Sequence, residues 1–242
     1  MPHRDLADIS KTGTAVGLTS SHAGEYEMNT TLSVCAAIAA GLAVHTHAQT
    51  ILNGDMTGPM AASIPPPSWT AWSDTADTCD ASGPFNYTGN PWVLSPNGGT
   101  FVRGGANNFG VNEGISQIVT GFIPGQTYAL EFYTTNLGFQ NPSSGWTGAD
   151  GFWRFFADGS AIGDSVTLTK PALGSDDIAW TFGTLSFVAP AASFELAFQS
   201  RWLGPDSAAY MGIDGVDVRL VPTPASMAVI ALAGVGTMRR RR

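Results

Sequence analysis

The acid–base residues of this chain limit the chemistry that it could perform. Histidine occurs only near the N-terminus, at His3, His22, His45 and His47. An apolar segment that ends in a small-residue exit predicts signal-peptidase cleavage after Ala48, so the expected mature chain contains no histidine. A Ser-His-Asp triad, a Cys-His pair and the usual zinc sites each need imidazole as a base or a ligand. The sequence therefore excludes these three classes of site.

Paired carboxylates remain as a possible catalytic group. A glycosidase places two Asp or Glu side chains across one cleft, and the glutamates after residue 48 are Glu113, Glu131 and Glu195. Glu131 and Glu195 fall at alternating positions of strand-like runs, where a carboxylate ordinarily faces solvent. We therefore expect a protein that is not an enzyme, with glycan cleavage as a minor alternative.

Tryptophan in loop-like sequence suggests sugar binding. A flat aromatic ring can stack on a sugar while Asn, Asp or Arg side chains bond to its hydroxyls. Trp146 lies in a polar, glycine-rich stretch, residues 141–150, where an exposed indole is expected only if a ligand stacks on it. The alternative is that the loop folds this ring inward as a lid on the core. The expected carbohydrate site consists of Trp146, Asp150, Asn141, Trp92, Arg201 and Trp202.

The segments that would position these residues have the period of β-strands. Apolar and polar residues alternate over residues 128–133 and 194–199, which is typical of a strand with one buried face. Similar short runs lie at residues 100–103, 115–119, 151–156, 165–169, 178–187 and 210–221. Turn signals such as Pro124-Gly125 and Asp158-Gly159 separate the runs. This spacing predicts an all-β fold, an antiparallel β-sandwich formed by residues 49–221.

The charge and cysteine content of residues 49–221 restrict the partners of this domain. The segment holds five Lys plus Arg and fifteen Asp plus Glu, a net charge of −10. Phosphate contacts need clustered Lys and Arg, so we expect no nucleic acid partner. Its one cysteine is Cys79, which rules out an intramolecular disulfide even in an oxidising compartment.

The two ends of the chain have the composition of targeting segments. Residues 28–48 are expected to be a secretory signal peptide handled by the Sec export machinery. Residues 1–27 are polar and have no hydrophobic period, so they are a disordered leader or the result of a misassigned start. At the other end, a short apolar run precedes four terminal arginines. The run is shorter than the roughly 20 residues of a spanning helix, and the arginines resist translocation, which predicts transient membrane association.

This C-terminal segment resembles the PEP-CTERM sorting signal of Gram-negative envelope proteins. The residues that carry the resemblance are Pro222, Pro224, Arg239, Arg240, Arg241 and Arg242, with Thr223 where the family has Glu. The resemblance implies that residues 222–242 are a sorting signal cut by exosortase. It also implies export to the cell envelope, the cell surface or a biofilm matrix. The alternative is an ordinary tail anchor with a basic stop.

The segment between these ends resembles the galactose-binding-like jelly roll of carbohydrate-binding modules. Three motifs carry the resemblance: Ile51-Leu52-Asn53-Gly54-Asp55, Pro124-Gly125-Gln126-Thr127-Tyr128 and Ile213-Asp214-Gly215-Val216. The resemblance implies a non-catalytic binding module for carbohydrate or exopolysaccharide. The alternative is a structural or adhesive matrix protein without specific sugar binding.

The last of these motifs raises the possibility of a metal. In an unbroken final strand Asp214 would share the core-facing parity of Val216 and Val218, where an unpaired carboxylate is costly. In related modules a calcium ion lies where the first and last strands meet, and calcium accepts carboxylate and carbonyl oxygens. The resemblance thus implies a structural calcium bound by Asn53, Asp55 and Asp214. Alternatively, Asp214 accepts backbone N–H bonds, or a bulge at Gly215 turns it outward.

Overall fold

The computed structural model describes residues 49–86, 91–107, 109–138, 148–172, 178–204 and 208–222. Over these ranges it contains strands and no helix, and hence no helix that could cross a membrane. The strands are β1 (Thr70–Trp72), β2 (Asp77–Cys79), β3 (Phe101–Asn107), β4 (Gly114–Thr120), β5 (Thr127–Asn136), β6 (Asp150–Ala157), β7 (Ser160–Asp164), β8 (Thr181–Val188), β9 (Ser193–Leu203) and β10 (Ala208–Leu220). The expected all-β fold is confirmed.

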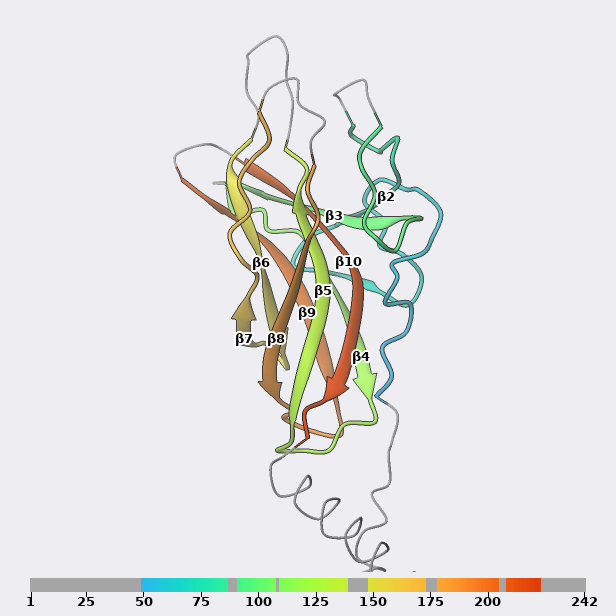
Figure 1. The fold of residues 1–242 in the computed structure, drawn as a ribbon, viewed down its shortest axis with the longest axis vertical. Helices are drawn as coiled ribbons and strands as arrows, with labels where there is room; N and C mark the ends of the chain where they lie inside the picture. Colours follow the sequence, from blue (N-terminus) through green and yellow to red (C-terminus); the bar gives the residue numbers. More distant parts are fainter. Residues whose placement is uncertain are drawn as a thin grey trace, which may run out of the picture. The chain divides into compact units, whose positions relative to one another are not determined.

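The strands form two antiparallel sheets packed face to face. Sheet A has the order β1-β4-β9-β6-β7, and sheet B has the order β2-β3-β10-β5-β8. Figure 1 shows β5, β8 and β10 of sheet B in front of strands of sheet A. If the eight strands from β3 to β10 are counted from one to eight, the sheets read 2-7-4-5 and 1-8-3-6. This is the strand order of a jelly roll.

Large aromatic side chains fill the space between the sheets. Phe132 of β5, Phe155 of β6 and Phe198 of β9 are buried, and the Phe155 ring lies 4.4 Å from that of Phe132 and 5.2 Å from that of Phe198. Trp153 is also buried, and its Nε1 donates to Gly212 O of the opposite sheet at 3.0 Å. The alternation seen over residues 128–133 and 194–199 thus places one face of each strand in this core.

A second apolar cluster covers part of the outer face of sheet B. Its buried members are Cys79, Trp92, Phe101, Leu137 and Ile178. The Phe101 ring of β3 lies 5.9 Å from the ring of Trp92 and 5.3 Å from that of Trp180. Burial raises the pKa of the Cys79 thiol. Sheet B is therefore apolar on both faces near this cluster. In a sandwich of two sheets alone, the outer face would be polar.

The last strand contains a β-bulge that reverses its alternation. The register with β5 shifts between Asp214 and Asp217, and Gly215 has a φ of +60°. Ile213 and Val216 both belong to the core, so Asp214, which pairs with Tyr133, lies on the outer face of sheet B. The alternative of a bulge at Gly215 that turns Asp214 outward is therefore confirmed, and an unbroken strand with Asp214 toward the core is wrong, because the extra residue of a bulge changes the parity on either side of it.

One predicted strand is displaced. The run at residues 165–169 forms only an isolated bridge, between Leu168 and Gly151. The strand next to β6 is instead β7, which follows the two-residue turn Asp158-Gly159, with φ of +46° and +72°. β7 is an edge strand without a buried side chain, so its sequence has no apolar alternation from which it could be predicted.

Candidate functional site

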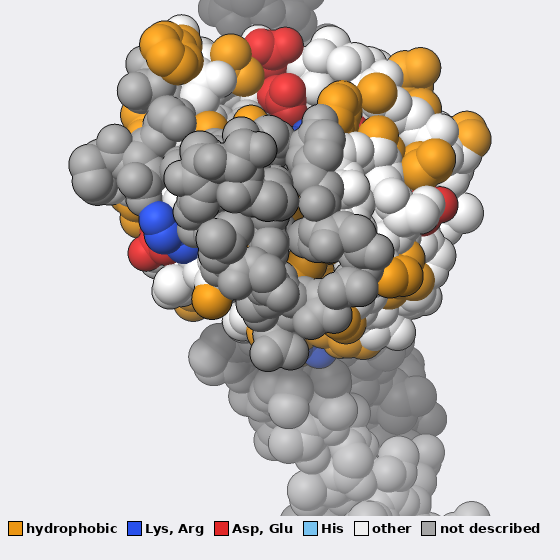
Figure 2. All heavy atoms as spheres, turned by 90° about the horizontal axis from the view of Figure 1, so that it is seen from above, with side chains coloured by type: hydrophobic (Ala, Val, Ile, Leu, Met, Phe, Trp, Pro, Cys, Tyr) orange, Lys and Arg blue, Asp and Glu red, His pale blue; other side chains and the backbone are white. Residues whose placement is uncertain are grey.

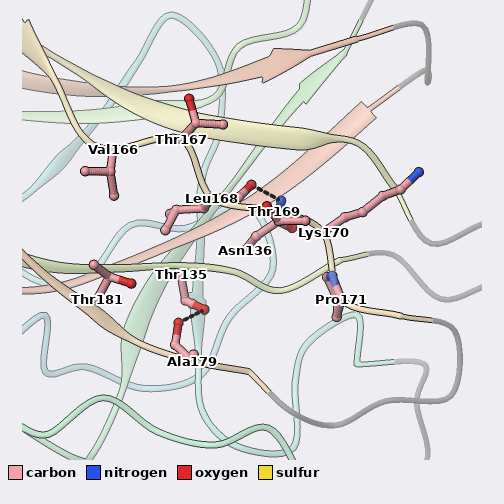
Figure 3. A pocket seen from close by; sticks show the side chains of 10 residues that line it. All are labelled: Thr135, Asn136, Val166, Thr167, Leu168, Thr169, Lys170, Pro171, Ala179 and Thr181. Carbon is pink, nitrogen blue, oxygen red and sulfur yellow. Dashed lines mark hydrogen bonds between the residues drawn. The ribbon is translucent and has the colours of Figure 1, made fainter.

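A polar pocket of about 360 Å³ opens at one edge of the sandwich. It lies between strands β5 and β8 of sheet B and the segment that follows β7 (Figure 3). The residues that line it are Thr135, Asn136, Val166, Thr167, Leu168, Thr169, Lys170, Pro171, Ala179 and Thr181. Its volume falls within the roughly 300–1,000 Å³ of small-molecule sites.

One wall of the pocket is formed by the chain that runs alongside β6 after β7. Ser165 N donates to Trp153 O at 2.8 Å, and Leu168 N donates to Gly151 O at 2.8 Å. Leu168 is buried in the core, while Thr167 and Thr169 on either side of it are exposed. The buried leucine thus fixes the segment to the sandwich and leaves the threonines at the surface.

Asn136, at the end of β5, holds three segments together beneath the pocket. Its side chain is buried, and Nδ2 donates to Ala149 O at 3.0 Å and to Leu168 O at 3.1 Å. Its Oδ1 accepts a hydrogen bond from Gly138 N at 2.9 Å. Because both amide hydrogens are used, Asn136 sets the shape of the pocket.

The threonine hydroxyls differ in how they are engaged. Thr135 Oγ1 donates to Ala179 O at 3.0 Å and is committed to the structure. The hydroxyls of Thr167, Thr169 and Thr181 have no hydrogen-bond partner in the part of the chain that the structure describes. Figure 3 shows the Thr181 hydroxyl turned toward Thr135, and the Lys170 amine turned away from the other residues that line the pocket. Each hydroxyl can donate one hydrogen bond and accept two, so the pocket offers neutral polar groups to a ligand.

The structure brings one of the predicted carbohydrate-binding residues to this pocket. Asp150, at the start of β6, accepts a hydrogen bond from the backbone N of pocket residue Lys170 at 2.9 Å. Trp146 and Asn141 lie outside the described residues. The remaining three predicted residues, Trp92, Arg201 and Trp202, do not line the pocket.

Those three residues have separate environments. Trp92 is 4% exposed and packs in the second apolar cluster, so its ring does not face solvent. Trp202 is half-buried and packs against the core between the sheets. Arg201, next to it in β9, is half-buried on the opposite side of the strand. These three residues therefore lie on different faces of the two sheets.

The predicted calcium ligands lie near one another, with several of their oxygens already engaged. Val216 N donates to Gly54 O at 2.9 Å, which places the opening motif against the bulge of β10. Asn53 Oδ1 accepts from Thr57 N at 2.9 Å, and Asp55 is exposed. Asp214 accepts hydrogen bonds from Ser95 Oγ and, at 2.7 Å, from Gly215 N.

Asp214 is nevertheless a buried carboxyl group that no cation of the described residues balances. Its burial raises its pKa to about 7, and the hydrogen bond from Ser95 opposes that shift. Among the described residues there is no group of three or more His, Cys, Asp or Glu side chains that could hold a metal ion. The calcium site stays a prediction of the sequence.

A buried ionic cluster on the outer face of β3 was not predicted. Arg103 pairs with Asp77 at 2.5 Å, and Gly105 N donates to Glu113 Oε2 at 2.5 Å. Burial raises the pKa of Glu113 to about 7, and the hydrogen bond from Gly105 opposes the shift. The signal in the sequence is a charged residue, Arg103, inside an otherwise apolar or small-residue strand.

The sorting signal falls almost wholly outside the structure. Pro222 is the last described residue, and Pro224 and Arg239 to Arg242 lie beyond it. The segments assigned to the leader and the signal peptide, residues 1–48, are likewise outside the described residues.

Comparison with known proteins finds no matching family, and three solved structures resemble the chain only at TM-scores below 0.5. No protein-family model matches the chain, and no curated protein matches it. A Stig cyclase from Fischerella sp. TAU is similar with a TM-score of 0.48 and 13% identity, over 72% of this chain and 97% of that chain. The carbohydrate-binding module TmCBM61, solved with β-1,4-galactotriose, is similar with a TM-score of 0.37 and 12% identity, over 64% and 90%. The K1 cleaved adhesin domain of Lys-gingipain from Porphyromonas gingivalis W83 has a TM-score of 0.40 and 15% identity, over 65% and 93%.

Proposed function

We propose that residues 49–221 form a non-catalytic module that binds a carbohydrate, with the polar pocket as its sugar site. The observation that carries the proposal is a pocket of about 360 Å³ whose lining includes Thr167, Thr169 and Thr181, three threonines with no hydroxyl partner in the described part of the chain. A sugar ring carries several hydroxyls that both donate and accept, and threonine hydroxyls can match either role.

The pocket supports binding better than hydrolysis. Glycoside cleavage needs one carboxylic acid and one carboxylate on opposite sides of the bond. None of the residues that line the pocket is Asp, Glu, His or Cys. The nearby Asp150 accepts a hydrogen bond from the Lys170 backbone. We therefore propose that the groups at this site hold a ligand in place and carry out no proton transfer.

A second candidate function is adhesion of a matrix protein through apolar surface. Phe182 of the edge strand β8 is 53% exposed, its ring lies 5.4 Å from that of Tyr133, and Val188 at the end of the same strand is 58% exposed. An exposed apolar edge strand favours contact with another protein chain.

We further propose that the domain works outside the cell. The signal peptide at residues 28–48 would direct Sec export, and exosortase would process the segment at residues 222–242 after transient membrane association. The final location would be the cell envelope, the cell surface or a biofilm matrix. An acidic domain of net charge −10 suits an exported soluble protein.

A glycan array followed by titration of the retained glycan tests the carbohydrate site. The domain is compared with Thr181→Val, which keeps the side-chain shape and removes a pocket hydroxyl. The control is Thr184→Val, which changes an exposed threonine of the same strand outside the pocket lining. We expect one class of polysaccharide to be retained, and Thr181→Val to weaken it roughly tenfold, which corresponds to about 1.4 kcal/mol. Blank spots throughout the array would favour the adhesive function instead.

A further inference from the structure

Arg201 is a half-buried cation without a partner. Within the described part of the chain it makes no hydrogen bond or ion pair, and its Nε is completely buried. Its burial lowers its pKa, and the neighbouring charge of Arg154 lowers it further. An arginine that is partly withdrawn from water is costly unless an anion compensates it. Among the described residues the charge of Asp164 opposes this shift, but Asp164 makes no hydrogen bond or ion pair with Arg201.

The carboxylate whose charge acts on Arg201, Asp164, already pairs with another arginine. Asp164 of β7 accepts two hydrogen bonds from Arg154, from Nε at 2.7 Å and from Nη2 at 2.9 Å. The same guanidinium lies 5.5 Å from the centre of the Phe152 ring. Arg154 is thus held by a fork-to-fork pair of the strong kind, and Arg201 is left as the cation available to a ligand.

Arg201 lies on the outer face of sheet A, in register with the rim of the pocket. Ser200 beside it donates to Gly105 O of the opposite sheet, so Arg201 points away from the core. Arg201 pairs with Phe152 of β6, and the bridge between Gly151 and Leu168 brings Thr167 next to Phe152 on the other side. Thr167 lines the pocket. With neighbouring strands about 4.8 Å apart, the backbone of Arg201 lies roughly 10 Å from this rim.

We propose that Arg201 binds the carboxylate of an acidic sugar, a uronate, in the same glycan whose neighbouring neutral sugar occupies the pocket. This proposal rests on the proposed carbohydrate-binding function and adds the class of glycan to it. The planar fork of a guanidinium matches a carboxylate in a bidentate manner. The row that runs from Arg201 through Phe152 to Thr167 supplies an apolar surface between the two subsites.

The charge of the domain defines the glycan further. A net charge of −10 over residues 49–221 repels a densely charged polyanion. Arg201, the guanidinium that has no hydrogen bond or ion pair in the described part of the chain, can compensate one carboxylate. The ligand that fits both facts is a polysaccharide in which a uronate occurs singly among neutral sugars.

The test uses an array of oligosaccharides in matched pairs that differ only by oxidation of one sugar to its uronate. The pair that is retained is then titrated calorimetrically at low salt, together with the 6-sulfate ester of the same oligosaccharide. We expect the uronate member to bind about tenfold tighter than the neutral one. Arg201→Gln should abolish this preference while neutral binding persists, and Arg201→Lys should keep part of it. The control Arg219→Gln removes the same charge from an exposed arginine on sheet B and should keep all of it.

Several outcomes would overturn the proposal. Equal affinity for the two members of a pair removes the uronate subsite but leaves the carbohydrate-binding function intact, whereas a blank array removes both. An Arg219→Gln loss equal to that of Arg201→Gln would show a general effect of charge. Tighter Arg201-dependent binding of the sulfate ester would make sulfate the anion. Because the native guanidinium has no partner, Arg201→Gln should not lower the melting temperature, and a marked decrease would assign Arg201 a structural role.

Discussion

Asp77 and Arg103 form a buried ion pair, with Asp77 Oδ2 2.5 Å from Arg103 Nη1 and side chains that are 3% and 6% exposed. The two residues also face each other in the pairing of β2 with β3. The guanidinium lies 4.2 Å from the centre of the Tyr210 ring and 5.0 Å from that of Phe85. The pair thus fixes a strand of only three residues, β2, at the edge of sheet B.

We predict that Arg103→Met alone lowers the free energy of unfolding by about 3–5 kcal/mol, because it leaves a buried carboxylate without its cation. The double variant Asp77→Leu with Arg103→Met should recover most of this loss. Urea unfolding measures both. The control is the exposed ion pair of Arg154 with Asp164. Arg154→Met should lower the free energy of unfolding by less than about 1 kcal/mol. Equal losses at the two sites would contradict the prediction.

Glu113 should make the stability of the domain depend on pH. Its pKa is raised from 4.5 to about 7 in the folded state. Between these values the folded protein holds a proton that the unfolded chain has released, so stability falls as the pH rises through this window. Glu113→Gln removes one of two groups that titrate in this window and should reduce the slope, and Asp214, whose pKa is also raised to about 7, contributes the remainder. Melting temperatures at about pH 4 and about pH 8 compare the two proteins. Parallel profiles would show that Glu113 has an ordinary pKa.

Two tryptophans should respond in opposite ways to truncation. Trp92→Ala should destabilise the domain by about 3–5 kcal/mol, as other deletions of large buried aromatics do, and leave glycan retention by the folded fraction unchanged. Trp146→Ala should reduce retention and leave the melting temperature unchanged, since we propose that this ring stacks on the sugar. Thermal melting and affinity electrophoresis on both variants provide the comparison. A destabilised Trp146→Ala would indicate that the ring is a lid on the core.

Calcium is predicted to stabilise the folded state through Asp214. The motif that contains Asn53 and Asp55 meets the bulge of β10 through the hydrogen bond between Val216 and Gly54. A metal that binds only the folded protein raises the melting temperature, so chelator should lower it and added calcium restore it. Asp214→Asn should remove this response, and Asp74→Asn, which changes an exposed carboxylate, should not. Identical melting curves in chelator and in excess calcium would argue against the site.

Mass spectrometry of the exported protein tests the predicted cleavage at both ends of the chain. The mature chain should begin near Gln49, because the apolar leader ends in a small-residue exit. Changing Arg239 to Arg242 to Ser should alter membrane retention without changing the melting temperature of the domain, since these residues act on translocation. Peptides from residues 1–27 in the exported form would contradict the predicted leader.

The sandwich could be predicted because its core-facing residues are large and alternate regularly. Residues 128–133 and 194–199 show this period, and both lie in strands of the eight-stranded jelly roll. The sequence leaves the bulge in β10 open as one of its alternatives, because Gly215 is compatible with either a regular or a left-handed conformation. Only the register with β5 decides for the bulge and for the outward position of Asp214.

The pocket and the second apolar cluster are harder to predict from the sequence than the core between the sheets. Thr167, Thr169 and Thr181 look like any surface threonines, and their convergence depends on pairing between distant segments. Trp92 is among the residues expected at the carbohydrate site, but the layer that covers sheet B buries it. Arg201 was named from its residue type, and only the strand register shows that its neighbour Trp202 points to the other side.

The order of the strands has a consequence for how the chain acquires its fold. β10, the last strand made, lies in the middle of sheet B between β3 and β5, and it pairs, for example, Ala209 with Ala106. Contacts between residues so far apart in the chain form slowly, and a chain that emerges N-terminus first cannot complete sheet B until β10 has been made. Under the proposed Sec export, the channel would therefore receive the polypeptide before it folds. A truncation before Ala208 would leave β3 and β5 with unpaired edges, which promote aggregation.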